Sequence, residues 1–178
     1  MKNTAMQARL SEEVLDLVHS RRSLMLASTC EDGSPYASYA PFAVGDDCLY
    51  ILVSDIAVHG LNLVREPRAS VLVIEDEDDC GELFARIRVN YRVEAQQIEN
   101  DSSEWQEGVA KLVARHGERP QKLSELADFR LFRLTPKSGR YVKGFGRAYD
   151  LVGGTLAGEA VNPKTDGHRP RQAAAANG

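Results

Sequence analysis

The stretch LFARIRVNYRVEA, residues 83–95, has the most regular alternation in the chain. Its odd-numbered positions are all apolar, namely Leu83, Ala85, Ile87, Val89, Tyr91, Val93 and Ala95. Since successive side chains of a strand point to opposite faces, this pattern predicts one long strand with a single apolar face. A long strand of this kind is typical of the wall of a β-barrel.

The opposite face of this predicted strand carries three arginines, Arg86, Arg88 and Arg92. Cations on one strand face repel each other unless nearby anionic groups neutralise them. Either an anionic ligand lies beside them, or they pair locally with Glu82, Glu94 or the acidic stretch 75–79. The sequence leaves both interpretations open.

A second alternating stretch is KSGRYVKGFGRAYD, residues 137–150. As a strand it would place rings and cations on one face, from Tyr141, Lys143, Phe145, Arg147 and Tyr149. The other face is small because of Gly144 and Gly146, so a flat ligand or a second backbone could come close. The pattern fits a planar anionic molecule, but on this stretch alone a plain sheet strand with a glycine bulge is the favoured interpretation.

Further elements are predicted from helical and alternating periodicity and from turn signals. The expected helices are 8–22, 56–65 and 101–116, with a short helical turn at 121–127. The expected strands are 24–29, 36–44, 49–53, 68–75, 83–95 and 129–134, followed by a turn at 135–139 and the ribbon 137–150. Six to seven sequential strands with flanking helices predict an α+β domain built around an antiparallel barrel, and its exposed strand faces suggest a dimer.

The composition is that of an ordinary globular chain, with 178 residues, 43% of them hydrophobic and 27% charged. We expect an N-terminal helix in 1–22, a barrel domain in 23–150 and a loose tail in 151–178. A net charge of −4 gives no general field for nucleic acid. We expect neither a signal peptide nor a membrane span, and three scattered cysteines suggest a reducing cytoplasm.

Several stretches resemble one known family. They are SYAPF (38–42), SDIAVHGLNLVREPRASVLVIEDE (54–77), LFARIRV (83–89), DFRLFRLTPKSGRYVKGFGRAY (128–149) and GHR (167–169). Together they are similar to the bacterial haem-utilisation proteins of the FMN-binding split-barrel superfamily, which includes pyridoxamine 5′-phosphate oxidase. The resemblance extends from about residue 21 to residue 169.

The resemblance implies a homodimer that binds haem and, in some members, degrades it oxidatively for iron acquisition. It makes His168, in the GHR motif, the axial ligand of the haem iron. It places Asp128 so that its carboxylate hydrogen-bonds this histidine across the dimer. A neutral imidazole is a strong axial donor, and a carboxylate on its other N–H raises its basicity.

Binding haem also requires cations that pair with its two propionate groups. From their strand faces we predict Arg88 and Arg92 on the alternating strand, and Lys143 and Arg147 on the ribbon, for this role.

Two alternative functions remain. One is an FMN-dependent oxidoreductase, in which the phosphate would bind where Ser54 begins a helix. His59 occupies the position at which superfamily flavoproteins often carry lysine or arginine, although Arg86 or Arg88 could replace that charge. The other is a non-catalytic haem carrier or store, which would use the same residues as a haem-degrading enzyme.

Overall fold

The structure is a computed structural model that describes residues 4–164. Its helices are α1 (Thr4–Ser20), α2 (Val58–Arg65), α3 (Ser103–His116) and α4 (Arg119–Ser124), with one 3-10 turn, η1 (Leu83–Ala85). Its strands are β1 (Ser23–Thr29), β2 (Pro35–Val44), β3 (Leu49–Ser54), β4 (Arg68–Ile74), β5 (Arg88–Gln97), β6 (Phe129–Val142), β7 (Ala148–Val152) and β8 (Ala160–Pro163).

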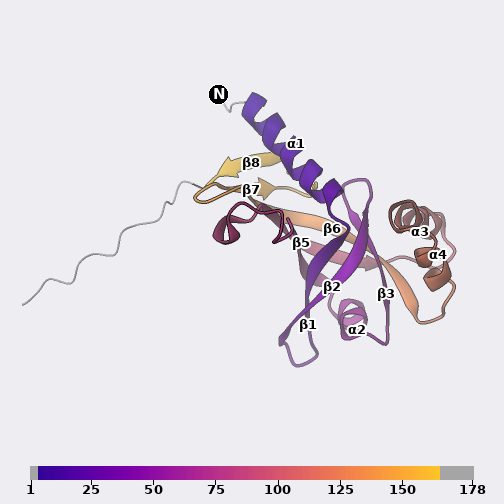
Figure 1. Ribbon diagram of the computed structural model, residues 1–178. Helices are drawn as coiled ribbons and strands as arrows, with labels where there is room; N and C mark the ends of the chain where they lie inside the picture. Colours follow the sequence, from indigo (N-terminus) through magenta and orange to yellow (C-terminus); the bar gives the residue numbers. More distant parts are fainter. Residues whose placement is uncertain (1–3, 165–178) are drawn as a thin grey trace, which may run out of the picture.

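The strands form one antiparallel sheet in the order β3-β2-β1-β4-β5-β6-β7-β8. Strand β3 also pairs with β6, so the first six strands close into a barrel, and β7 and β8 extend the sheet beyond it (Figure 1). Closure removes the exposed edges that an open sheet would leave. The predicted α+β barrel is therefore confirmed, with one strand more than expected.

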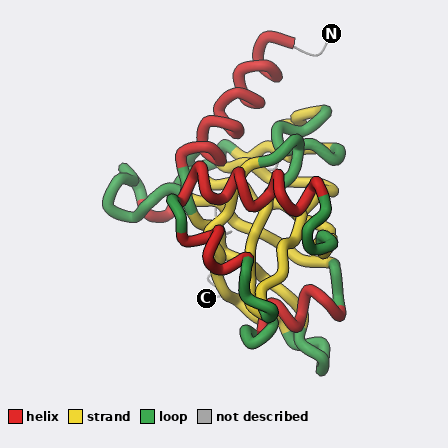
Figure 2. Tube along the Cα trace, turned by 90° about the vertical axis from the view of Figure 1, so that its right-hand side faces the viewer, coloured by secondary structure: helices red, strands yellow, loops and turns green. Residues whose placement is uncertain are grey.

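The barrel interior is filled by the inward residues of the alternating strands, and helix α1 joins this core. Leu10, Val14, Leu17 and Val18 of α1 are buried in it. A second apolar cluster lies outside the barrel, where Trp105, Val109 and Leu112 of α3 pack on Tyr50 and Leu131. Helices α3 and α4 thus cover the wall made by β2, β3 and β6 (Figure 2).

Strand β5 confirms the predicted alternation from Val89 to Ala95, but the first part of the predicted strand is wrong. Residues 83–85 form the 3-10 turn η1, because the Glu82 side chain accepts a hydrogen bond from the amide of Phe84. This local cap replaces a strand ladder with a turn.

The predicted turn at 135–139 is also wrong, because β6 runs unbroken from Phe129 to Val142. In its pairing with β5, Arg92 faces Ser138 while Val93 faces Pro136, so Lys137 is an extra residue in a β-bulge. Proline and glycine are common at bulges as well as at turns, which explains the error.

The ribbon 137–150 is not one strand. It ends β6 at Val142, turns through Gly144 and Gly146, whose φ angles are +149° and +70°, and starts β7 at Ala148. Tyr141 is buried whereas Phe145 is exposed, so the predicted continuous face of rings and cations does not form. Only glycine adopts such backbone angles readily, which is why the ribbon folds into a hairpin here.

The chain after residue 150 is ordered into strands as far as residue 163, rather than forming a loose tail. Strand β7 continues to Val152, so the expected domain boundary falls inside it, and β8 (Ala160–Pro163) pairs with β7. Residues 165–178 lie outside the described part of the chain. No helix within residues 4–164 is long and apolar enough to cross a membrane.

Candidate ligand-binding site

A row of apolar side chains crosses the outer face of the barrel on three neighbouring strands. Met25 of β1 lies opposite Tyr39 of β2 and Leu72 of β4. Met25 is 54% exposed and Tyr39 is 63% exposed. On the other wall of the barrel α3 and α4 cover such residues, but within residues 4–164 no helix buries this row. An uncovered apolar row of this kind is typical of a ligand or partner contact.

Two of the predicted arginines border this apolar row. Arg88 of β5 lies opposite Ile74 of β4, and Arg92 lies opposite Ser70, two residues before Leu72. All of them point outward, because the alternating residues of β4 and β5 fill the barrel. The face therefore combines apolar area with cations at one side, while the role predicted for Arg88 and Arg92 at the propionates stays a prediction.

A pocket of about 360 Å³ opens at the end of the same face, above Met25, Leu72 and Ile74. Its basic lining residues are Arg21, Arg22 and Arg86. Arg21 pairs with Asp76 at 2.8 Å, and Arg86 pairs with Glu77 at 3.3 Å and also donates to the backbone oxygen of Glu75. The acidic stretch 75–79 thus neutralises part of this positive charge, as the local-pairing interpretation of the sequence expected.

The sequence-based reasoning missed Arg21 and Arg22 as members of this basic pocket. Both fall within the predicted helix 8–22, at its C-terminal end, where cations suit the helix dipole. The available signal was their position between α1 and β1, because the first residues of a strand lie at the rim of a barrel.

Lys143 and Arg147 lie elsewhere. The Lys143 ammonium contacts both carboxylate oxygens of Glu13 in α1, at 2.6 and 2.8 Å, and is largely buried. Its charge is therefore neutralised within the chain. Arg147 lies in the β6–β7 hairpin and donates to the Lys143 carbonyl. Neither cation shares the outer face with Arg88 and Arg92, so their predicted role at the propionates gains no support.

Asp128 forms a corner with Ser54 where β3 ends and β6 begins. The Ser54 hydroxyl donates to Oδ2 of Asp128 at 2.6 Å and accepts from the amide of Ile56 at 3.0 Å. The amide of Asp55 donates to the Asp128 carbonyl at 2.8 Å, and Arg130 pairs with Asp55 at 2.7 Å. Asp128 is half-buried, its carboxylate is held by the Ser54 hydroxyl, and its main chain is held by the amide of Asp55.

His59 lies on α2 with its Nδ1 3.0 Å from the Ser38 hydroxyl of β2. Burial lowers the pKa of His59 and so disfavours its cationic form. His59 is therefore a poor source of the positive charge that a phosphate would need here. The two nearby carboxylates, Asp55 and Asp128, make this helix start still less suited to an anion.

Gly60 allows α2 to approach the Ser54 backbone closely. A Cβ atom at this position would lie only 2.2 Å from the Ser54 carbonyl oxygen and 2.9 Å from its carbonyl carbon. Neither atom can rotate away, since both belong to the backbone. Gly60 therefore fixes how α2 is placed against the Ser54–Asp128 corner.

We expect Gly60→Ala to lower the free energy of unfolding by about 2 kcal/mol through overpacking. Urea denaturation of the purified variant measures this loss. Gly81→Ala is the matched control, because a Cβ there meets nothing within 4 Å. Equal stability of Gly60→Ala and the unmodified protein would contradict this packing.

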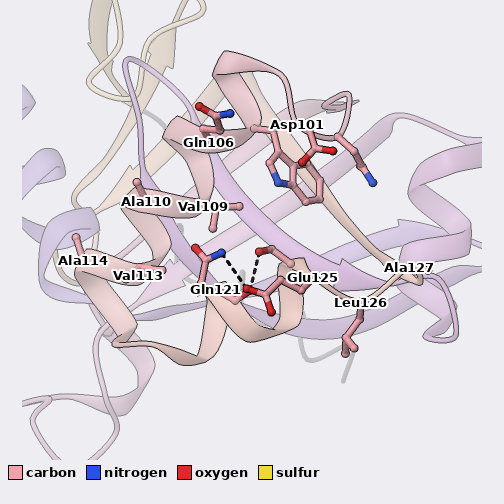
Figure 3. A pocket seen from close by; sticks show the side chains of 13 residues that line it. Asp101, Gln106, Val109, Ala110, Val113, Ala114, Gln121, Glu125, Leu126 and Ala127 are labelled. Carbon is pink, nitrogen blue, oxygen red and sulfur yellow. Dashed lines mark hydrogen bonds between the residues drawn. The ribbon is translucent and has the colours of Figure 1, made fainter.

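A groove of about 680 Å³ lies between α3 and α4. Val109, Val113 and Ala110 line it from α3, while Gln121 and Glu125, hydrogen-bonded to each other, face them from α4 (Figure 3). It ends at Leu126 and Ala127, directly before Asp128. None of the residues predicted from the sequence lines it.

The predicted axial ligand, His168, lies outside the described residues. The other three histidines lie within the described residues. His59 contacts Ser38, the His116 Nε2 is 2.8 Å from the Phe42 carbonyl oxygen, and His19 is exposed on α1. Within residues 4–164 no group of three or more metal-binding side chains occurs. An apolar face bordered by arginines fits a planar anionic molecule better than an inorganic ion.

These features define a split-barrel protein with an uncovered apolar outer face. Residues 10–143 match the family model described as pyridoxamine 5′-phosphate oxidase, and the chain belongs to that family.

Within the family it is similar to haem oxygenase HutZ of Vibrio cholerae, with 40% identity over 156 residues, covering 88% of this chain and 89% of HutZ. A solved structure of V. cholerae HutZ, described as a haem storage protein, superimposes with a TM-score of 0.68 and 39% identity. That superposition covers 71% of this chain and 89% of that chain.

Two further solved structures share the architecture. Campylobacter jejuni ChuZ superimposes with a TM-score of 0.75 and 28% identity, covering 92% of this chain and 68% of ChuZ. A haem-binding protein of Mycobacterium smegmatis also gives a TM-score of 0.75, with 26% identity, covering 83% of this chain and 60% of that chain.

Proposed function

We propose that this protein binds haem between two copies of itself and degrades it, with oxygen and a reductant, for iron acquisition. The observation that carries the proposal is the outer face, where the row Tyr39–Met25–Leu72 is bordered by Arg88 and Arg92. Such a surface suits the apolar plane and the two carboxylates of haem. The 40% identity to a haem oxygenase supports the same conclusion.

In this proposal, His168 supplies the imidazole that ligates the iron, and Arg88 and Arg92 pair with the propionates. Bound haem would supply the iron at which oxygen is activated. Asp128 accepts a hydrogen bond from the imidazole N–H of His168 in the partner, which raises the basicity of that ligand and fixes its tautomer. A more basic ligand places more electron density on the iron and favours oxygen activation.

A haem carrier or store is the second candidate, and it is favoured by the description of the HutZ structure as a storage protein. An FMN-dependent oxidoreductase is less well supported. The Ser54 hydroxyl is already bonded to Asp128 and to the amide of Ile56, and burial disfavours the cationic form of His59 by lowering its pKa. The start of α2 is therefore a poor cradle for the phosphate of FMN.

Haem titration separates the three functions. We expect a saturable Soret band on adding haem to the purified protein, and its loss when ascorbate and oxygen are added. A Soret band that persists under ascorbate and oxygen would identify a carrier. A protein that is purified yellow, releases flavin on heating and gives no Soret band would overturn haem binding in favour of FMN.

The homodimer is part of this proposal, and the uncovered row around Met25 is our candidate for its interface. The exposed stripe of α2, made by Val58, Leu61 and Val64, offers further apolar area. Apolar patches of this kind usually mark contact surfaces on soluble proteins. We also propose a cytoplasmic location, supported by the three cysteines, which are all unpaired.

We expect Met25→Glu to weaken the dimer about tenfold or more, because association would bury an unpaired carboxylate. Analytical ultracentrifugation over a concentration series measures the change. Ala110→Glu on α3 adds the same charge to the wall that α3 and α4 cover and should leave the dimer intact. A Met25→Glu protein that remains dimeric at every concentration would exclude this face as the interface.

A further inference from the structure

We propose that Ser54 is a positioning residue that fixes which oxygen of Asp128 is offered to the ligand histidine. The proposal rests on the function proposed above and assigns Ser54 a role other than binding a flavin phosphate. It begins from the short hydrogen bond, 2.6 Å, between the Ser54 hydroxyl and Oδ2 of Asp128.

The direction of this hydrogen bond follows from the second partner of the hydroxyl. A backbone N–H can only donate, so the amide of Ile56, 3.0 Å away, occupies a lone pair of Ser54 Oγ. The single hydrogen of the hydroxyl is then free for the carboxylate. Ser54 therefore donates to Asp128, and Oδ2 is the acceptor.

The backbone fixes the rest of the corner. The amide of Asp55 donates to the carbonyl oxygen of Asp128, so the main chains of the two residues are tied next to the side-chain bond. Gly60 lets α2 press directly on the Ser54 carbonyl, which limits movement of the serine. Rotation of the Asp128 carboxylate is thus opposed by a hydrogen bond from a residue that is itself held.

The second carboxylate oxygen of Asp128 is Oδ1. Within residues 4–164 no hydrogen bond uses Oδ1 of Asp128, whereas Oδ2 is taken by Ser54. Oδ1 is therefore the oxygen left for an imidazole N–H. Without Ser54 the carboxylate would sample several rotations, and the hydrogen bond to the imidazole would be formed for less of the time.

Haem-loaded Ser54→Ala and Ser54→Thr test this role. The resonance Raman band of the iron–imidazole stretch reports how much the ligand is polarised by its hydrogen-bond partner. We expect Ser54→Ala to shift this band part of the way toward its position in Asp128→Asn, and to lower haem turnover about tenfold while haem affinity is kept. Ser54→Thr retains the hydroxyl and should restore the unmodified band.

A matched control and two further outcomes separate a failure of the Ser54 role from a failure of the proposed function. Ser124→Ala removes a serine hydroxyl that donates to the Gln121 carbonyl, close to Asp128 in sequence, and should leave the band unchanged. If Asp128→Asn shifts the band and Ser54→Ala does not, or shifts it the opposite way, the role of Ser54 is wrong and the function stands. If Asp128→Asn leaves the band unchanged, the roles of Asp128 and Ser54 are both wrong, and if the unmodified protein binds no haem, the proposed function fails instead.

Discussion

Replacing His168 with alanine is expected to lower haem affinity by about 100-fold or more. Losing even an outer-shell partner of a metal ligand commonly costs about 10- to 100-fold, and His168 is proposed to be the ligand itself. The Soret band of the variant should also move to that of haem without an imidazole ligand. Titration followed by absorbance gives both quantities in one experiment.

His19→Ala is the appropriate control for this experiment, because His19 is an exposed histidine on α1, away from the outer face. It should bind haem like the unmodified protein. Added imidazole should restore the original Soret position to His168→Ala if only the ligand has been lost. Identical spectra and affinities for His168→Ala and the unmodified protein would refute the assignment of the ligand.

Replacing Asp128 with asparagine is expected to leave haem affinity within about threefold but to lower turnover by about 10- to 100-fold. Asparagine has nearly the same shape, and its amide oxygen can still accept the hydrogen bond from Ser54. It lacks the negative charge that raises the basicity of the imidazole. Binding and breakdown should therefore separate in this variant, which can be measured as Soret decay under ascorbate.

Glu125→Gln removes a carboxylate three residues before Asp128, where Glu125 accepts from Gln121 at the end of α4. Turnover of this control should match that of the unmodified protein, which would show that general charge loss near the corner is harmless. Unchanged turnover of Asp128→Asn would mean that its carboxylate does not assist the reaction.

Much of the fold could be predicted because its elements have local signals. The alternation of Val89, Tyr91, Val93 and Ala95 marks a strand with one buried face, and β5 has that face. The helix predicted at 101–116 has a capping serine at its start, where the Ser102 side chain accepts from the Trp105 amide at the beginning of α3. Such signals depend on neighbours within about one or two turns of chain.

The wrong predictions for residues 135–139 and 137–150 share one cause. The stretch 135–139 contains proline and glycine, which signal a turn, but tertiary pairing with β5 holds it in a strand with a bulge. The ribbon 137–150 alternates like a strand, but its two glycines adopt left-handed angles and form a hairpin. In both places the local sequence permits two conformations, and the adjacent strands decide between them.

The candidate site likewise combines features set by local sequence with features set by tertiary contacts. The sequence by itself determined that Arg88 and Arg92 lie on the outer face of one strand, since the side-chain period of a strand is two. Only the tertiary structure decided that Ile74 and Leu72 stand beside them, that Lys143 is neutralised by Glu13, and that Ser54 meets Asp128. These partners are far apart in sequence, and their contacts depend on strand order and register, which no local pattern encodes.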